Sequence, residues 1–494
     1  MRRNTKIVAT YGPALAAPGR IEEAVLAGVD VFRLNLSYGD RESHRTAMAE
    51  IRRVAEALGH PCAVLVDLRG PKIRVGADLA EAIVLAPGEA VRLEPVGAPG
   101  AAGAPPASDE VTAAAAEESE ATPPRRIPID GHPTLAADLR AGEPVLLDDG
   151  RLRLRAGAAT GEGIVCQVEV GGEVRPRQGV NLPKTDLQTL ENPTAKDWRD
   201  LEFAIEEGAD WIALSFVRRA EELERLRRRI READADIPLI AKIEKQEALH
   251  RLDEIVAAAD GIMVARGDLG VETELAEVTL RQKEIIRTCN RTGKVVITAT
   301  QMLESMIERA SPTRAEVADV SNAIFDGTDA LMLSGETAIG AHPIEAIRFM
   351  ASVAKYTESA RETQLTLERR PYFSEVPDAV AHGACLTAHE VDAAALICLT
   401  RSGLTARLVS RYRPRCPVIA VSPHMTTVRR LALVWGVCAF HLPRDLEGDA
   451  LVEGALDTAR HAGWLETGEH VVLTAGVSPG PLRGKTNLIR VEVL

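Results

Sequence analysis

The chain has 494 residues, of which 46% are hydrophobic and 27% are charged, and its formal net charge is −13. A chain of this length is too long for one compact core, so about three domains are expected. The acidic balance, with a pI near 5.5, argues against a nucleic acid or an acidic membrane as a partner, since neither attracts a surface without a basic excess.

The cysteines and the first residues indicate the compartment. The seven cysteines are scattered and never spaced as C-x-x-C, a pattern typical of reduced cytosolic thiols. Residues 1–10 pass from two arginines directly into a strand-like run, without the apolar region of a signal peptide. No apolar stretch is long enough to span a bilayer, so a cytoplasmic protein is expected.

Short β-branched runs alternate with amphipathic helical stretches from the N-terminus onward. Runs that are apolar almost throughout indicate strands buried on both faces, as in a parallel sheet covered by helices. Ser311-Pro312-Thr313 is typical of a helix start before residues 314–325. Eight strand–helix units predict an α/β fold with a (β/α)8 TIM barrel. The expected barrel strands are 5–10, 29–36, 62–67, 209–217, 238–244, 260–266, 294–300 and 328–334.

Two further regions depart from the barrel pattern. Residues 76–178 carry short strand-like pieces without a long helix, which predicts a small β-barrel inserted into the main barrel. Within them, the Ala/Pro-rich stretch 97–124 cannot bury a core, so a flexible excursion is expected there. A second alternating pattern predicts a C-terminal α/β domain. The expected domain limits are 1–75 with 179–365, 76–178, and 366–494.

Charged side chains stand where the predicted barrel strands end, which is where such barrels place their active sites. Glu244 and Asp268 end neighbouring strands, and paired carboxylates suit a hard cation such as Mg²⁺. Lys242 shares a strand face with Glu244. Together with Arg33 and Arg74, it would clamp a phosphate. Cations, a divalent metal and no obvious nucleophile predict phosphoryl transfer by positioning and charge neutralisation.

Any one of these residues alone would more often be a solvated loop residue, and hydroxyls such as Thr300 and Ser334 commonly satisfy nearby backbone groups. Their joint occurrence at the ends of six strands favours a site. Two other motifs fail. Gly484-Lys485-Thr486 resembles the end of a P-loop, but Pro479 replaces its first glycine. His389-Glu390 begins a zincin-like pattern that Ala393 interrupts.

Seven motifs appear in a fixed order: TKIVATYGP, FRLNLSYG, DLRGPKIR, LIAKIE, IMVARGDLGVE, TATQMLESM and DALMLSGETAIG. Together with the later TRSGLTARLVSRYRPRCPVIAVS, they resemble the pyruvate kinase family over nearly the whole chain. The resemblance implies transfer of the phosphoryl group of phosphoenolpyruvate to ADP, giving pyruvate and ATP. It also implies Mg²⁺ or Mn²⁺ as cofactor, an inserted domain that acts as a lid, and a cytoplasmic homotetramer.

The resemblance implies roles for the strand-end residues. Glu244 and Asp268 would ligate the Mg²⁺ that bridges the substrate, Lys242 would stabilise the phosphoryl group in flight, and Arg33 would hold it. Thr300 and Ser334 would help to deliver a proton to the enolate. Backbone amides near a helix start would receive the substrate carboxylate. These amides belong to Ala265, Arg266 and Gly267.

A second set of residues is expected around the nucleotide. Lys196 matches a family lysine near the nucleotide phosphates, and Arg74 and Asn35 are expected beside it. Where Tyr38 stands, family members commonly have His, so adenine is expected to stack on Tyr38 and Pro13. Asp148 and Asp149 would lie on the lid. The segment 181–195 is longer than the family linker.

Many pyruvate kinases hold K⁺ with groups that match Asn35, Ser37, Asp67 and the carbonyl of Leu68. In those members Glu stands at the position of Lys72, and Thr at that of Leu68. A lysine ammonium is a compact charge able to replace a bound K⁺, and its charge disfavours K⁺ nearby. The sequence therefore predicts activity with Mg²⁺ and without K⁺, unless Lys72 merely points to solvent.

A phosphate-bearing effector is the last expected ligand. Thr400-Arg401-Ser402-Gly403-Leu404-Thr405 links a strand to a helix, where hydroxyls and amides can converge on a phosphate. The family places a sugar-phosphate or nucleotide activator there, and Arg483 or Lys485 could hold a second phosphate. The competing interpretation is an ordinary loop.

Two rival functions stay open. A Mg²⁺-dependent carbon–carbon lyase acting on phosphoenolpyruvate-like substrates shares the barrel and the metal, but needs neither Lys242 nor an ADP lid. A catalytically inactive sugar-phosphate sensor predicts loss of Lys242, Glu244, Asp268 or Thr300, yet all four are present.

Overall fold

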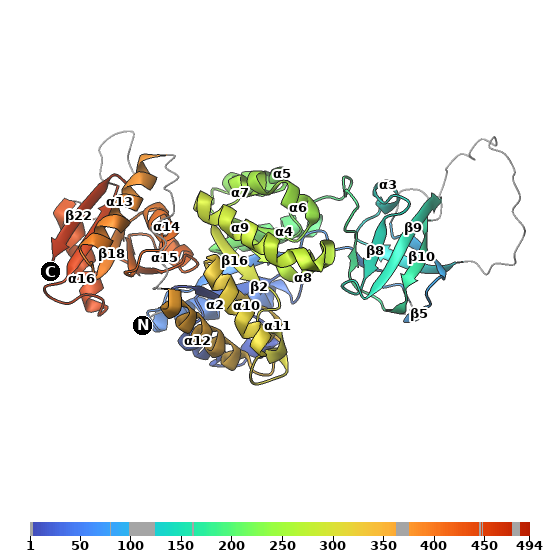
Figure 1. Ribbon diagram of the computed structural model, residues 1–494, viewed down its shortest axis with the longest axis horizontal. Coiled ribbons are helices and arrows are strands. Elements are labelled where there is room, and N and C mark those ends of the chain that lie inside the picture. The colour runs from blue at the N-terminus through green and yellow to red at the C-terminus, as the bar shows by residue number, and fades with distance from the viewer. Residues whose placement is uncertain are drawn as a thin grey trace, which may run out of the picture.

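The computed structural model describes residues 3–79, 81–97, 124–160, 163–361, 375–443, 446, 448–476 and 485–494. Its three parts follow one another along the long axis of the molecule, with the barrel in the middle (Figure 1). Most of the excursion expected at 97–124, and Arg483 of the expected effector site, lie outside the described residues. All seven cysteines are free thiols.

The central part is a closed barrel of eight strands, as predicted. All neighbouring strands are parallel, and the apolar runs of the sequence form them because both faces are covered. One core lies between strands and helices, and a second fills the barrel and continues into the C-terminal domain. The strands are β1 (Lys6–Thr10), β2 (Val31–Asn35), β3 (Ala63–Leu68), β13 (Trp211–Leu214), β14 (Leu239–Ile243), β15 (Gly261–Ala265), β16 (Val295–Ala299) and β17 (Ala330–Leu333).

The helices that cover the barrel are set by local sequence signals. The predicted helix start before residue 314 is confirmed. The Thr313 side chain caps α10 by accepting the amide hydrogen of Glu316, and the Glu316 side chain accepts the amide hydrogen of Thr313. No helix among the described residues is both long and apolar enough to cross a membrane. The covering helices are α1 (Arg20–Ala27), α2 (Arg41–Ala57), α4 (Ala195–Glu206), α5 (Ala220–Glu232), α6 (Gln246–His250), α7 (Leu252–Ala258), α8 (Arg266–Glu272), α9 (Val278–Thr292), α10 (Arg314–Asp326), α11 (Gly335–Ala338) and α12 (Pro343–Arg361).

The part inserted between β3 and α4 is a seven-stranded sheet in the order β12-β8-β9-β10-β6-β7-β4. A bridge between Arg74 and Gly179 joins its two end strands, and its own apolar core fills it, as expected for a small barrel. Its elements are β4 (Arg74–Val75), β6 (Ala90–Pro95), β7 (Arg125–Asp130), α3 (Leu135–Asp138), β8 (Pro144–Leu147), β9 (Leu152–Thr160), β10 (Gly163–Val170) and β12 (Val180–Asn181), with a separate pair β5 (Ile83–Leu85) and β11 (Gly172–Val174).

The C-terminal part is a five-stranded sheet in the order β20-β19-β18-β21-β22, in which only β22 runs antiparallel to its neighbour. The predicted α/β domain with mixed strands at its end is confirmed. Its elements are α13 (Val376–Glu390), β18 (Ala395–Leu399), α14 (Leu404–Arg411), β19 (Val418–Ser422), α15 (Met425–Leu431), β20 (Val437–His441), α16 (Gly448–His461), β21 (His470–Ala475) and β22 (Leu488–Val493).

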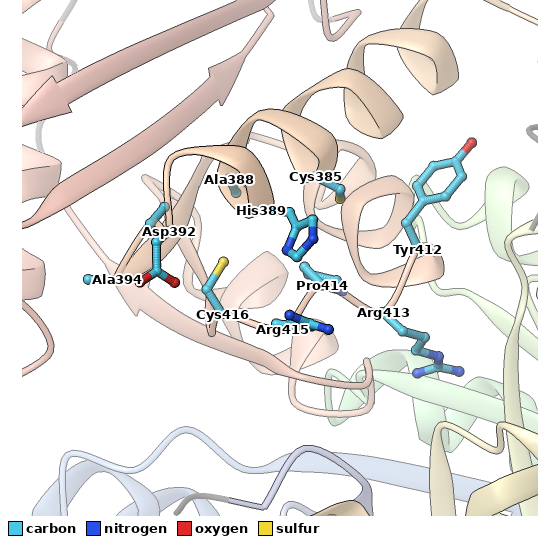
Figure 2. A pocket seen from close by; sticks show the side chains of 11 residues that line it. Cys385, Ala388, His389, Asp392, Ala394, Tyr412, Arg413, Pro414, Arg415 and Cys416 are labelled. Atoms are coloured by element: carbon cyan, nitrogen blue, oxygen red, sulfur yellow. The ribbon is translucent and has the colours of Figure 1, made fainter. Parts of the chain in front are cut away.

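A cavity of about 340 Å³ opens in this domain between α13 and the segment that precedes β19 (Figure 2). His389 and Cys416 line it, but Arg413 turns its guanidinium to Asp329 and Gly327 of the barrel. No group of three or more metal-ligating side chains exists anywhere in the described parts of the chain. His389 is therefore in no such group.

Candidate active site

Three charged side chains meet at the carboxyl ends of β2, β3 and β14. Asp67 is buried and accepts hydrogen bonds from Arg33, whose Nε lies 2.7 Å from Asp67 Oδ2. The ammonium of Lys242 lies 3.3 Å from the same oxygen. Burial alone would raise the pKa of Asp67, but Lys242 and Arg33 outweigh it and lower that pKa. Asp67 is therefore an anion that holds two cations at the barrel mouth.

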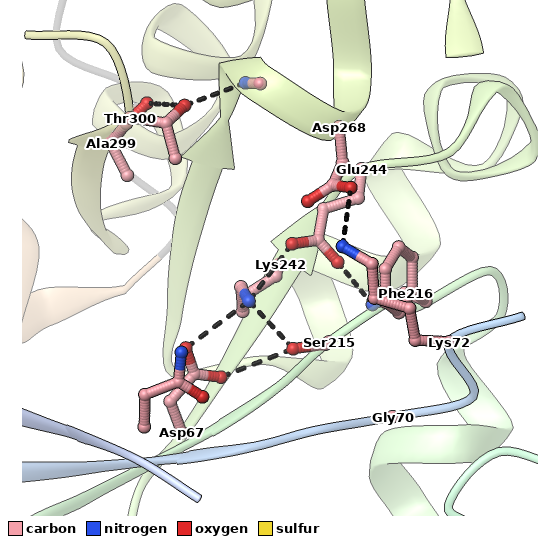
Figure 3. Close-up of polar contacts among 12 residues, drawn as sticks. Asp67, Gly70, Lys72, Ser215, Phe216, Lys242, Glu244, Asp268, Ala299 and Thr300 are labelled. Atoms are coloured by element: carbon pink, nitrogen blue, oxygen red, sulfur yellow. Dashed lines mark hydrogen bonds and ion pairs between the residues drawn. The ribbon is translucent and has the colours of Figure 1, made fainter. Parts of the chain in front are cut away.

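Lys242 is the centre of the cluster (Figure 3). Its Nζ donates to Ser215 Oγ at 2.7 Å and lies 3.0 Å from Glu244 Oε1. Burial tends to lower the pKa of Lys242, but attraction from Asp67 and Glu244 outweighs burial and raises that pKa. The lysine is therefore held as a cation, and its ammonium is buried with the rest of the side chain.

Glu244 and Asp268 lie at the ends of neighbouring strands, and the sequence predicted them as two ligands of one divalent metal. Glu244 is almost fully buried, and its Oε2 accepts the amide hydrogen of Phe216 at 2.7 Å. Burial raises the pKa of Glu244; Lys242 opposes this rise and the charge of Asp268 adds to it. Asp268, in the first turn of α8, is partly exposed. Two crowded carboxylates of this kind are a donor set that a hard divalent cation stabilises, with water and substrate oxygens completing its ligands.

Strained backbone shapes the rim of the site. Phe216, Thr300 and Gln301 have φ values of 54°, 67° and 54°, in the left-handed region that costs non-glycine residues about 1–3 kcal/mol. Gly70, at φ 64°, passes so close that an added Cβ would lie 2.6 Å from the carbonyl oxygen of Ser215. Such strain accumulates where a site needs a particular group orientation.

The structure joins Thr300 to the amides expected to receive a carboxylate. Thr300 Oγ1 accepts the amide hydrogen of Gly267 at 2.7 Å, so in this state that amide is already paired. The Arg266 side chain points away to Asp319 and to the carbonyl of Thr300, which it holds in place. Ser334 Oγ is buried without a hydrogen-bond partner among the described residues.

The monovalent-cation residues are only partly brought together. Asn35 Oδ1 accepts the amide hydrogen of Ser37 at 3.1 Å, and the Leu68 carbonyl accepts from Ser215 at 2.8 Å. Lys72 turns inward, with its Nζ 3.4 Å from Asp268 Oδ1 and 5.8 Å from the centre of the Phe216 ring. The lysine thus contacts a proposed metal ligand, and the described residues show no direct bond from it to the four K⁺ groups.

The two basic residues expected at the nucleotide are engaged with other parts of the protein. Lys196 Nζ donates to the carbonyl of Leu36 at 2.8 Å and pairs with Asp200. Arg74 donates to the carbonyl of Arg177 at 2.9 Å. Tyr38 is 68% exposed and Pro13 is also exposed, so both rings are open to a ligand. On the inserted domain, Asp148 and Asp149 form the left-handed turn between β8 and β9.

In the C-terminal domain, the expected effector loop is closed by its own hydroxyls. Thr400 Oγ1 accepts the amide hydrogen of Gly403 at 2.9 Å, and Thr405 and Thr486 pair through their hydroxyls at 2.7 Å. Ser402 is exposed at the turn before α14. Lys485 lies 3.7 Å from Glu375, an exposed pair of little energetic weight.

Several residues that hold this site were not predicted from the sequence. Ser215 bridges Lys242 and the Leu68 carbonyl, and it lies near the end of the predicted strand 209–217, so a hydroxyl at that position was the available signal. Glu336 accepts the amide hydrogens of Leu303 and Ser334. Asn192 donates to the carbonyl of Phe216 at 3.0 Å and steadies the strained turn. It lies outside the barrel strands, where no periodic pattern marks it.

Comparison with known proteins supplies the family. Residues 2–98 and 104–347 match the model of the pyruvate kinase barrel domain, and residues 378–492 match the pyruvate kinase alpha/beta domain. The chain is 42% identical to a pyruvate kinase of Geobacillus stearothermophilus over 500 aligned residues, covering 100% of this chain and 81% of the relative. It is 40% identical to a pyruvate kinase of Agrobacterium vitis, covering 99% and 98%. Pyruvate kinase 2 of Synechocystis is also 40% identical, with 100% and 79% covered. The chain belongs to the pyruvate kinase family of phosphotransferases.

Proposed function

We propose that this chain transfers the phosphoryl group of phosphoenolpyruvate to ADP, giving pyruvate and ATP. The observation that carries the proposal is the buried ammonium of Lys242 between Asp67 and Glu244, at the mouth of the barrel beside Asp268. An assay that couples pyruvate formation to NADH oxidation by lactate dehydrogenase tests it. Pyruvate must form only when phosphoenolpyruvate, ADP and Mg²⁺ are all present.

In the proposed reaction, the bond between the enol oxygen and phosphorus breaks while an oxygen of the ADP β-phosphate bonds to phosphorus. Arg33 and Lys242 place positive charge where the phosphoryl oxygens gain negative charge, so they stabilise the transition state more than the ground state. The enolate that remains takes a proton at its terminal carbon and becomes pyruvate. Thr300 and the unpaired hydroxyl of Ser334 would orient that proton delivery.

We further propose Mg²⁺, or Mn²⁺ in its place, as the divalent cofactor. Glu244 and Asp268 would hold it, and when bound it neutralises charge on the substrate phosphate. The fit rests on two carboxylates at neighbouring strand ends, one of them buried. Backbone amides of Ala265, Arg266 and Gly267 would bind the substrate carboxylate. For Gly267, this requires its bond to Thr300 to open.

Around these residues we propose the wider organisation expected from the sequence. ADP would lie against Lys196, Arg74, Asn35, Tyr38 and Pro13, under the inserted domain acting as a lid. The limits 1–75 with 179–365, 76–178, and 366–494 would delimit catalytic, lid and regulatory domains. A homotetramer would be its assembled form, which sedimentation equilibrium measures directly.

Ser215 is expected to act on catalysis through Lys242, and Ser215→Ala should lower kcat about tenfold. The change removes a buried hydrogen bond to a charged group, worth roughly 1.5 kcal/mol or more, and frees the ammonium to move. Steady-state kinetics measure the loss. Ser410→Ala is the matched control, because Ser410 Oγ makes an equally buried bond to the carbonyl of Trp435 in the C-terminal domain. An equal loss of kcat in both variants would contradict this role.

We also propose that a phosphate-bearing effector binds at Thr400, Ser402, Gly403 and Thr405, with Arg483 or Lys485 nearby. The exposed Ser402 ahead of α14 supports it, since the first amides of a helix attract phosphate. Ser402→Asp should abolish the response to an activating sugar phosphate or to AMP by adding a negative charge, while activity without effector persists. Ser359→Asp, at a partly exposed position of α12, is the control. An activator that acts equally on wild type and Ser402→Asp would rule out this site.

A further inference from the structure

The short helix α8 is contacted at both ends by the two connections of the inserted domain. In the incoming connection, Lys72 Nζ lies 3.4 Å from Asp268 Oδ1 at the start of α8. In the outgoing connection, Asn181 Nδ2 donates to Glu272 Oε1 at the end of α8, at 2.8 Å. Between these contacts, the hairpin turn of the inserted domain approaches α8, because a Cβ on Gly150 would lie 3.9 Å from Val271.

Glu272 is the buried centre of the second contact. Its Oε1 also lies 2.7 Å from Lys245 Nζ, so Asn181 and Lys245, from two other segments of the chain, share this one oxygen. Glu272 is 1%, Lys245 6% and Asn181 7% exposed. Glu272 Oε2 is buried without a hydrogen-bond partner among the described residues. This set, the Asn181–Glu272–Lys245 cluster, takes no part in the proposed chemistry.

The cluster is placed between the two proposed metal ligands and the inserted domain. Lys245 directly follows Glu244, and Glu272 follows Asp268 by four residues, about one helical turn. Asn181 belongs to β12, which pairs with β8 just before the turn that carries Asp148 and Asp149. The cluster therefore fixes the end of β14, the helix α8 and one connection of the inserted domain relative to one another.

The buried cluster outweighs the other contact of α8. The Lys72–Asp268 pair is longer, and its side chains are 30% and 26% exposed, so solvent weakens it. Taking Asn181 away from Glu272 breaks a buried hydrogen bond to a charged group, although Lys245 stays paired with the carboxylate. Movement of the inserted domain that takes Asn181 from Glu272 is therefore opposed. Any ligand that fixes α8 in place therefore also favours the position of the inserted domain in which Asn181 contacts Glu272.

We propose that Glu272 is a positioning residue that couples divalent-metal binding at Glu244 and Asp268 to the position of the inserted domain. Metal fixes Asp268, and with it α8, while Glu272 transmits this orientation to Asn181. Because binding couplings are reciprocal, the position of the inserted domain then also sets metal affinity. This inference rests on the proposed function for the assignment of the two metal ligands.

Hydrogen exchange with Mn²⁺ as the only ligand tests the coupling without turnover. The reporting amides are those of Val75, Arg177 and Val180, which bond across the two connections to Gln178, Val75 and Ile73. In wild type, saturating Mn²⁺ should slow their exchange at least fivefold. In Glu272→Gln and Asn181→Ala this slowing should disappear, although electron paramagnetic resonance still detects bound Mn²⁺. Asn181→Ala keeps the Lys245–Glu272 pair, so it is informative even if Glu272→Gln is unstable.

Asp210→Asn is the matched control. Asp210 is as buried as Glu272 and pairs with Arg52 and Arg429, but it precedes β13 at the opposite end of the barrel. It should keep the metal-induced slowing. Wild type that binds Mn²⁺ without slowing, or variants that keep the slowing, would overturn the coupling alone. Wild type that binds no Mn²⁺ would overturn the metal assignment, and the coupling with it.

Discussion

Replacing Lys242 with methionine is expected to lower kcat by about 10²–10³-fold, roughly 3–4 kcal/mol of transition-state stabilisation. The ammonium is buried among Asp67, Ser215 and Glu244, where methionine supplies no positive charge. Methionine keeps most of the volume of the side chain, and the fold should persist. Glu244→Gln should lose activity comparably, because it weakens the proposed metal ligand. Stopped-flow and steady-state assays measure both losses.

A matched control separates this effect from general destabilisation. Lys6 is also buried, and its Nζ donates to the carbonyl of Val437 at 2.8 Å, at the opposite end of the barrel. Lys6→Met should lower the melting temperature and leave kcat within about twofold of wild type. Near-normal kcat in Lys242→Met, with normal Mg²⁺ dependence, would show that the site is wrongly assigned.

We propose that K⁺ is not required, and charge reversal at Lys72 is the second large expected effect. In K⁺-free buffer, Lys72→Glu should lower kcat about 10²-fold, ~2.7 kcal/mol. The variant places a carboxylate where an ammonium now lies 3.4 Å from Asp268, and repulsion between like charges replaces attraction. Added KCl should restore part of the activity, because K⁺ can supply the missing charge near Asn35, Ser37, Asp67 and Leu68.

The measurement is turnover in tetramethylammonium buffer with and without KCl at matched ionic strength. Wild type should respond less than about tenfold, which corresponds to ~1.4 kcal/mol. Lys355→Glu reverses the charge of an exposed lysine on α12, and it controls for the change in net charge. Stronger activation of wild type by K⁺, or a Lys72→Glu variant that is as active as wild type without K⁺, would contradict the proposed role of Lys72.

The barrel was predictable because each strand is an apolar run buried on both faces, a signal that lies within a few residues of sequence. The same local periodicity placed Lys242 and Glu244 on one face, and their charged groups lie 3.0 Å apart. Asp67 and Lys72 were predicted for a cation site. The contact of Asp67 with Lys242, and that of Lys72 with Asp268, depend on which strand ends face each other across the barrel.

Features set by long-range packing could not be predicted. The left-handed backbone of Phe216 and Thr300 follows no residue preference, since neither is glycine. Ser215 reaches Lys242 only because β13 and β14 pair in a particular register. Nothing in the local sequence marks Glu272 as buried, and its contacts with Asn181 and Lys245 join residues far apart in the chain.

Phosphorus NMR of the complete reaction tests the central claim most directly. With phosphoenolpyruvate, ADP and Mg²⁺ but no K⁺, the phosphoenolpyruvate signal should fall while the γ-phosphate signal of ATP rises by an equal amount. A lyase would consume phosphoenolpyruvate without forming ATP, and an inactive sensor would leave both signals unchanged. The predicted result is one ATP formed for each phosphoenolpyruvate consumed by the wild type, and almost no ATP formed by Lys242→Met. Release of inorganic phosphate in place of ATP, or no reaction, would contradict the account.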